Sequence, residues 1–260
     1  MLQTFAEDHE WIMVASIVFF FTAIAVGISW LLISKQTRPF FERYEGIVPP
    51  FLSLPAVLFS LTVALMATSI WENYSMANKS VRSESLGLET IVELAESVPS
   101  LKEGPLASYA KDYARSIIND EWVTLSTHGS PAAVTKKHFE ILRNATFAAI
   151  DALDNNAQAK VLTNAFQLVN DSRKTRLSFV SFDIHPLRWY ASIILAVLVQ
   201  LVVALVHIPR PQVLPLVMGV TTLTILLPMC TIAVTLSNPY VGMISISNSP
   251  LQAVVSNIHK

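Results

Sequence analysis

Four long stretches of this chain contain no charged residue and consist mostly of apolar ones. A helix that crosses a lipid bilayer needs about 20 such residues, because its side chains face hydrocarbon and its backbone polar groups must be satisfied within the helix. Four of the five tryptophans lie near the ends of these stretches, where membrane helices favour them. We therefore expect four membrane-spanning helices, at residues 11–33, 47–71, 189–207 and 211–236.

The charged residues gather between the second and the third of these stretches. They make up 14% of the chain, against roughly 25% in an ordinary soluble domain, but 27 of the 37 lie within residues 72–188. The expected organisation is a first transmembrane hairpin at 1–71, a water-exposed domain at 72–188, a second hairpin at 189–236 and a C-terminal tail at 237–260.

Sequence patterns in the middle domain indicate helices throughout. No proline follows Trp71 before Pro99, so the second span is expected to continue into water as one long helix. Apolar residues then recur every three or four positions over 106–122, which predicts an amphipathic helix. The Gly-Ser-Pro sequence at 129–131 predicts the next helix start, with its serine as N-cap and its proline as first helical residue. The expected helices of this all-α integral membrane protein are 106–122, 133–150 and 157–179 in the middle domain.

Lysine and arginine residues near the span ends are distributed unequally between the two sides of the membrane. Seven lie on the side that would hold both termini and the middle domain, and four on the opposite side. Cytoplasmic segments of membrane proteins carry an excess of basic residues. We therefore expect the domain and both termini to be cytoplasmic.

The sequence carries no motif that predicts catalysis. It has no glycine-rich phosphate loop, no nucleophile elbow and no zinc-protease motif, and its single cysteine is Cys230. A net charge of −1 also disfavours nucleic acid as a partner. We therefore expect no enzymatic activity, no cofactor and no metal site.

Two acidic residues of the middle domain, Glu84 and Glu121, admit two interpretations. As a pair inside a helical bundle, they would be the one candidate acid/base pair of an enzyme. Alternatively, they pair with Arg173 or Arg176 between helices, and contacts of this kind commonly specify packing. We favour the second interpretation.

The four spans contain no acidic or basic residue. Proton-coupled carriers and pumps usually place such residues at membrane depth. Their absence from the sequence of the spans disfavours a charge-relay transporter. It leaves two classes of protein, a pore lined by apolar and small polar groups or a purely structural membrane protein.

Two sets of residues in the spans are candidates to line a pore. One face of the second span would form an apolar ring if several copies packed around an axis, and such a ring can gate conduction by dewetting; it could equally be a lipid-facing or packing surface. The threonines of the fourth span are the other set, although such hydroxyls usually bond to their own helix or to a neighbour. The first set is Ser53, Val57, Leu61, Leu65 and Thr68, and the second is Thr221, Thr222, Thr224, Thr231 and Thr235.

Four sequence segments resemble a known family in their order and spacing. They are FSLTVALMATSIWENYSMANKSVRSE at 59–84, NDEW at 119–122, RxxRL at 173–177 and SNPYVG at 237–242. Together they resemble the bacterial bestrophin-like membrane proteins, long catalogued as a domain of unknown function. These proteins are similar in length and have two spans, a helical insert and two more spans.

The resemblance implies a function, because this family is distantly similar to the bestrophins, which are pentameric ion channels. It implies a homo-oligomer, with a pentamer favoured, in the inner (cell) membrane of a bacterium, in contact with membrane lipid and small inorganic ions, chloride among them. The pore neck would be formed by Val57, Leu61 and Leu65, and a turn after the last span by Asn238, Pro239 and Tyr240. The calcium-binding acidic cluster of animal bestrophins has no counterpart after residue 242, so calcium gating is not implied.

Two hypotheses for the function follow. In the first, the chain forms a bestrophin-like, homo-oligomeric and anion-conducting channel with an apolar neck. In the second, it is a non-conducting membrane scaffold or accessory subunit of a larger complex, which binds another protein through the amphipathic face of residues 106–122.

Overall fold

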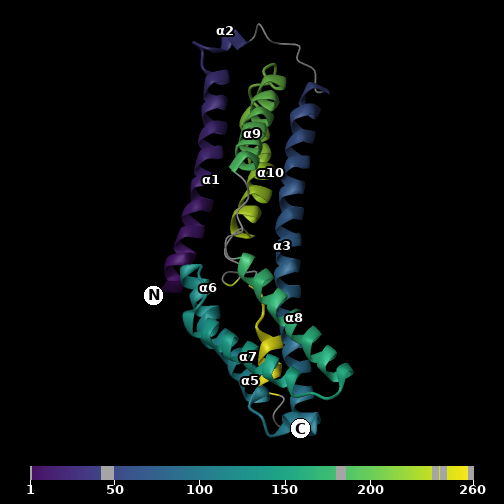
Figure 1. Cartoon of the computed structure of the whole chain (residues 1–260). Helices are drawn as coiled ribbons and strands as arrows, with labels where there is room; N and C mark the ends of the chain where they lie inside the picture. Colours follow the sequence, from purple (N-terminus) through teal and green to yellow (C-terminus); the bar gives the residue numbers. More distant parts are fainter. Residues whose placement is uncertain (1, 42–49, 180–185, 236–239, 241–244, 257–260) are drawn as a thin grey trace. The chain divides into compact units, whose positions relative to one another are not determined.

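The computed structural model describes residues 2–41, 50–179, 186–235, 240 and 245–256 (Figure 1). These residues form helices and connecting turns, and none of them lies in a β-strand. The expected all-α fold class is confirmed.

Among the described residues, four helices are long and apolar enough to cross a membrane, as expected. The second is 48 residues long and continues far beyond a membrane span, as expected from the absence of proline after Trp71. The fourth begins three residues later than expected, because residues 211–213 form turns in which the Val213 amide donates to the Arg210 carbonyl. The four are α1 (Leu2–Ile33), α3 (Pro50–Ser97), α9 (Pro186–Val206) and α10 (Leu214–Thr235).

The chain divides into two compact units, which are described separately. Unit 1 comprises Met1–Trp71 and Asp183–Ser237, and unit 2 comprises Glu72–Phe182 and Asn238–Lys260. The sequence predicts a separate C-terminal tail from residue 237. Its described residues instead belong to unit 2, and they include a further helix, α11 (Ser249–Ser256).

Unit 1 is held together by contacts among α1, α9 and α10. Gln200 of α9 is fully buried between these helices, where its Nε2 donates to the Phe21 carbonyl (3.3 Å) and to Thr222 Oγ1 (3.1 Å). Polar bonds of this kind join membrane helices where apolar side chains cannot distinguish a neighbour from lipid. The membrane part of α3 contacts this group through Met66, whose sulfur accepts a hydrogen bond from Ser192 Oγ (3.1 Å).

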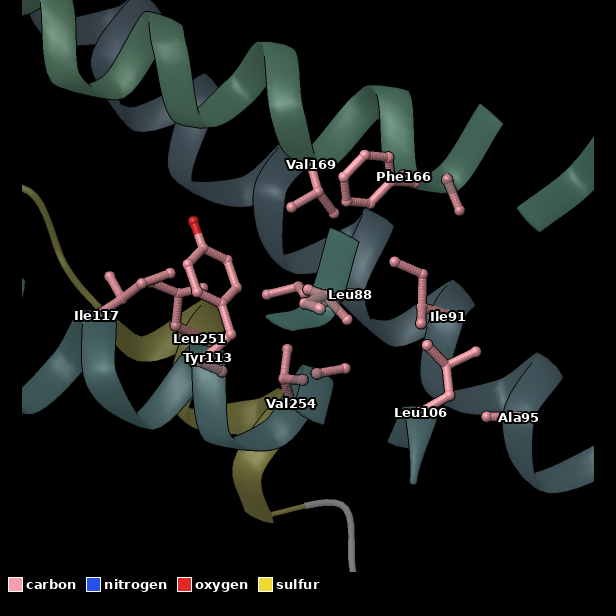
Figure 2. Packing of buried hydrophobic residues seen from close by; sticks show 14 of the residues in the cluster. Leu88, Ile91, Ala95, Leu106, Tyr113, Ile117, Phe166, Val169, Leu251 and Val254 are labelled. Atoms are coloured by element: carbon pink, nitrogen blue, oxygen red, sulfur yellow. The ribbon is translucent and has the colours of Figure 1, made fainter. Parts of the chain in front are cut away.

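The core of unit 2 is built mainly from α3, α5 (Leu106–Ser116), α7 (Ala133–Asp151), α8 (Asn156–Ser178) and α11. Figure 2 shows side chains of α3, α5, α8 and α11 meeting in one cluster. Ser85 of α3 also donates to the Pro250 carbonyl at the start of α11 (2.7 Å). The fully or almost fully buried members of the cluster include Leu88, Ile91, Tyr113, Ile117, Val169, Leu251 and Val254.

The sequence predicts one α-helix over residues 106–122, but the structure interrupts it with a π-helical turn. α5 is followed by η2 (Ile117–Glu121) and then by α6 (Trp122–His128). In an unbroken α-helix, Leu125 would lie about 120° around the axis from Tyr113, since each residue advances by about 100°. The extra residue of a π-turn rotates the following residues back. This brings Leu125 back to within about 20° of Tyr113 around the axis, and Leu125 is fully buried.

The remaining helix starts differ slightly from the sequence prediction. Ser130 and Pro131 do not begin the third helix, because α7 (Ala133–Asp151) starts after Ala132, the extended N-cap residue. The turn is made instead by Gly129, whose φ of 60° ends α6 in the left-handed region. α8 begins at Asn156, one residue early, with the side chain of Asn155 accepting from the Ala157 amide (2.9 Å). The short helices α2 (Arg38–Phe41) and α4 (Pro99–Lys102) complete the described elements.

Gly87 lies where α3 approaches α8 closely, and this predicts whether Gly87→Ala stabilises or destabilises the protein. A Cβ atom on Gly87 would lie 2.7 Å from Val169 Cγ2 and 2.8 Å from the Ala165 carbonyl oxygen. Helix propensity alone would make Gly87→Ala stabilising by about 1 kcal/mol. We expect it to be destabilising by about 1–3 kcal/mol, because the two helices must separate.

Thermal unfolding of the purified protein in detergent measures this effect. Gly27→Ala in α1 is the matched control, because a Cβ there meets no atom within 4 Å. Gly27→Ala should keep or raise the midpoint temperature of unfolding. An equal or higher midpoint for Gly87→Ala would show that the helices do not pack this closely.

Candidate functional site

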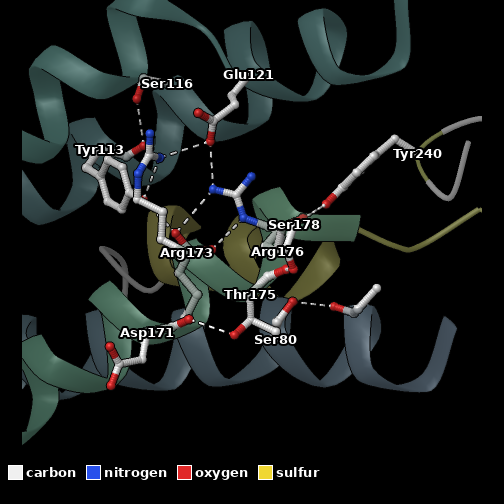
Figure 3. A network of polar contacts seen from close by, with 12 residues as sticks. Ser80, Tyr113, Ser116, Glu121, Asp171, Arg173, Thr175, Arg176, Ser178 and Tyr240 are labelled. Carbon is white, nitrogen blue, oxygen red and sulfur yellow. Dashed lines mark hydrogen bonds and ion pairs between the residues drawn. The ribbon is translucent and has the colours of Figure 1, made fainter. Parts of the chain in front are cut away.

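A cluster of buried charged residues joins three helical elements of unit 2 (Figure 3). Glu84 comes from α3, Glu121 ends the π-turn η2, and Arg173 and Arg176 come from α8. The two arginines are three residues apart, so they lie on one face of α8. The structure thus brings together all four residues considered as interhelix polar contacts. We call them, with Tyr113, the buried ion-pair cluster.

Arg176 binds both carboxylates. Its Nε lies 2.6 Å from Glu84 Oε2, and its Nη2 lies 3.3 Å from Glu84 Oε1 and 2.6 Å from Glu121 Oε2. All three side chains have no exposed surface. The planar guanidinium suits this arrangement, since it grips one carboxylate with two donors while reaching a second.

Arg173 and Tyr113 complete the buried ion-pair cluster. Arg173 Nη1 donates to Glu121 Oε2 and to Tyr113 Oη, both at 3.1 Å, and Tyr113 Oη donates to Glu84 Oε1 at 2.6 Å. The guanidinium of Arg173 also lies over the ring of Phe139, 5.1 Å from its centroid. The two acids, the two bases and the neutral phenol form a cluster with no net charge.

The surroundings of Tyr113 and Arg176 raise the pKa values of both groups. Burial raises the pKa of Tyr113 well above its usual value, and Glu84 raises it further, so the phenol stays a donor. Burial would lower the pKa of Arg176, but Glu84 and Glu121 raise it, and the net direction is upward. Carboxylates gripped by two guanidinium groups are ion-pair partners, whereas an acid/base catalyst must exchange protons. The geometry therefore matches the interpretation that these residues hold helices together.

Tyr240 fastens the segment that follows α10 to unit 2. Its hydroxyl donates to the backbone carbonyl of Arg176 (2.7 Å), and its ring meets that of Trp122 edge to face, with centroids 5.1 Å apart. Burial raises the pKa of Tyr240, so this hydroxyl also stays a donor. The other two residues of the expected turn, Asn238 and Pro239, lie outside the described residues.

The expected neck residues lie on one face of α3 and are exposed in the single chain. Val57, Leu61 and Leu65 keep 60%, 54% and 59% of their surface accessible. The opposite face is buried within unit 1 and comprises Phe59, Val63 and Met66. In this structure of one chain, the described residues leave more than half of the surface of each expected neck residue exposed.

The threonines of the fourth span use their hydroxyls within their own helix. Each donates to a backbone carbonyl four residues earlier, as Thr221 does to Val217 (2.8 Å) and Thr224 to Val220 (2.9 Å). The others of the set are Thr222, Thr231 and Thr235. These hydroxyl hydrogens are therefore engaged, and the geometry does not favour them as a polar pore lining.

Three roles in the structure were not anticipated from the sequence. The hydroxyl of Tyr113 binds Glu84, the hydroxyl of Tyr240 binds the Arg176 backbone, and Gln200 links three membrane helices. Gln200 had a visible signal, since a lone amide inside an apolar span usually bonds to a neighbouring helix. The partners of the two tyrosines carried no signal in the sequence.

Comparison with known families assigns most of the chain to one of them. The family model described as "Bestrophin-like domain" matches residues 17–251. No curated protein sequence matches the chain.

Solved structures with the same fold are distant in sequence. A variant of a bacterial bestrophin homologue from Klebsiella pneumoniae is 14% identical with a TM-score of 0.69, and the match covers 94% of this chain and 96% of that one. Another structure of a bestrophin homologue from the same organism is 13% identical with a TM-score of 0.65, covering 92% and 96%. A third, described only as a membrane protein, is 11% identical with a TM-score of 0.69, covering 94% and 97%. These likenesses establish the fold over almost the whole chain.

The buried ion-pair cluster predicts a large effect of Arg176→Met on stability. The substitution fills the volume of the side chain but leaves Glu84 and Glu121 buried without their main partner. We expect the free energy of unfolding to fall by about 3–5 kcal/mol, measured by denaturant unfolding in detergent. Lys111→Met is the control, because it breaks the more exposed pair with Glu96 (2.8 Å) and should cost about 1 kcal/mol or less. Equal losses for the two variants would contradict the prediction.

Proposed function

Because this chain belongs to the bestrophin-like family, we propose that it is the subunit of a homo-oligomeric ion channel with an apolar neck formed by α3. The four apolar helices make it a membrane protein. The proposal extends from there to a pentamer, to conduction of anions such as chloride, and to a neck of Val57, Leu61 and Leu65.

The exposed face of α3 is the observation that carries this proposal. Three large apolar side chains, four residues apart, project from one side of a helix that has membrane-span length and hydropathy. Around a rotation axis, each would form one ring, and the rings would stack about one helical turn apart. An apolar ring of this kind excludes water when narrow and conducts when slightly wider.

A small side chain beside this face supports close packing of several copies. Ala64 is exposed on α3 about 60° around the axis from Leu61 of the proposed neck. Small residues let membrane helices approach closely, which a ring of α3 helices around a narrow axis requires. The other membrane helices would then surround this ring, with α1, α9 and α10 packed together in each subunit.

The proposed selectivity for anions rests on the charges that the sequence omits. Cation channels commonly use rings of acidic side chains, and the four apolar stretches contain none. The proposed location is the bacterial cell membrane. Unit 2 and both termini would lie in the cytoplasm, because seven of the eleven basic residues near span ends lie on that side.

Ion flux through reconstituted protein tests the proposed function. Liposomes that contain the wild-type protein should release chloride faster than empty liposomes. Leu61→Ala should raise the flux several-fold, because it widens the apolar ring and eases its wetting. Leu223→Ala on α10 is the control, since this leucine is also largely exposed but lies outside the proposed neck. Wild-type flux equal to that of empty liposomes would favour the non-conducting scaffold.

The mass of the intact particle tests the proposed oligomer independently of conduction. Native mass spectrometry from detergent should give five times the mass of one chain. A monomeric particle would contradict the channel, because a neck formed by one face of α3 needs several copies around an axis.

A further inference from the structure

The chain passes between the two units three times, and one of three hydrogen-bonded residues lies close to each passage. We call these residues, Glu84, Arg176 and Tyr240, the polar node. The passages follow Trp71, Phe182 and Ser237. Glu84 lies 13 residues after the first, Arg176 six residues before the second, and Tyr240 three residues after the third. Each passage is therefore within 13 residues, along the chain, of one of these three residues.

Arg176 contacts the other two residues directly. Its guanidinium grips Glu84 with two donors, at 2.6 and 3.3 Å, and its backbone carbonyl accepts the Tyr240 hydroxyl at 2.7 Å (Figure 3). Through these bonds, α3, the end of α8 and the segment after α10 meet at one residue. All three contacts are buried, so water does not compete for them.

We propose that Arg176 is a positioning residue that makes these three connections shift together, so that unit 2 sets how often the pore is open. The effect on the pore rests on the proposed channel function. The coupling among the three segments of unit 2 stands on the contacts alone.

The π-turn gives this node a second hydrogen-bonding register. Among the described residues, Glu121 Oε1 and Arg176 Nη1 are buried without a hydrogen-bond partner, so the pair holds unused bonding capacity. In an unbroken α-helix, Asp120 would lie about 20° around the axis from Tyr113. An acidic side chain would therefore face the arginines in either register. Burial of Leu125 favours the observed one.

A change of register in the π-turn would alter the ring contact of Tyr240. Trp122 follows the π-turn directly, and its ring is the edge-to-face partner of Tyr240. Loss of the extra residue per turn would rotate Trp122 by about 100° and break this contact. Interconversion between two discrete packings is how a local change is passed along a rigid element.

Tyr240→Phe tests the coupling, because it removes one hydrogen bond and keeps the ring. In single-channel recordings, the ratio of open to closed times should change about fivefold, the effect of one hydrogen bond. The unitary conductance should not change, since the neck is untouched. Thr146→Val is the control: it also removes one buried hydrogen bond of unit 2, from Thr146 Oγ1 to the Leu142 carbonyl (2.8 Å), but within α7 and away from the three passages. A gating ratio for Tyr240→Phe equal to that of the control would overturn the proposal.

Hydrogen exchange on the same variants tests the coupling even if the protein does not conduct. In Tyr240→Phe, amides around Glu84 in α3 and around Arg176 in α8 should exchange about fivefold faster than in Thr146→Val. Faster exchange confined to the neighbourhood of residue 240 would overturn the proposal. Absence of current in the wild type together with coupled exchange would reject the channel and retain the coupling.

Discussion

The packing of unit 2 depends on the pairing of Arg176 with two carboxylates at once. Burying a charge is costly unless it is paired and hydrogen-bonded, so each member of the buried ion-pair cluster requires the others. Glu84 fixes the rotation of α3 and Arg176 that of α8, whereas burial of Leu125 favours the register of the π-turn that places Glu121 against Arg176. The surrounding apolar core supplies most of the driving force for folding, but it would tolerate small rotations of these helices. The ion pairs select one arrangement.

The membrane helices were predictable because a bilayer imposes a simple length and an absence of charge. The π-turn and α11 were not. From Leu106 to Ile117 the apolar spacing fits an ordinary α-helix, and the extra residue is needed only further along, where both Glu121 and Leu125 are fully buried. In α11, only Leu251 and Val254 are fully buried in the core, too few to form a period that the sequence alone reveals.

The polar contacts of the site were predictable in kind but not in detail. Helical spacing places Arg173 and Arg176 on one face, so a partnership with Glu84 and Glu121 was a reasonable inference. The helical spacing does not show that Arg176 binds both Glu84 and Glu121, because this depends on distances between helices that are far apart in the chain. The same is true of Tyr240, whose hydroxyl binds a backbone atom. Any residue could have supplied that acceptor, so no side-chain pattern marks it.

The burial of the ion-pair cluster determines how the stability of unit 2 responds to salt. Exposed charges are screened by dissolved salt, but buried pairs are screened far less. The contacts among Glu84, Glu121 and Arg176 have no exposed surface, so their strength should be nearly independent of ionic strength. A membrane protein whose surroundings gain and lose salt would then keep the alignment of its water-exposed helices through those changes.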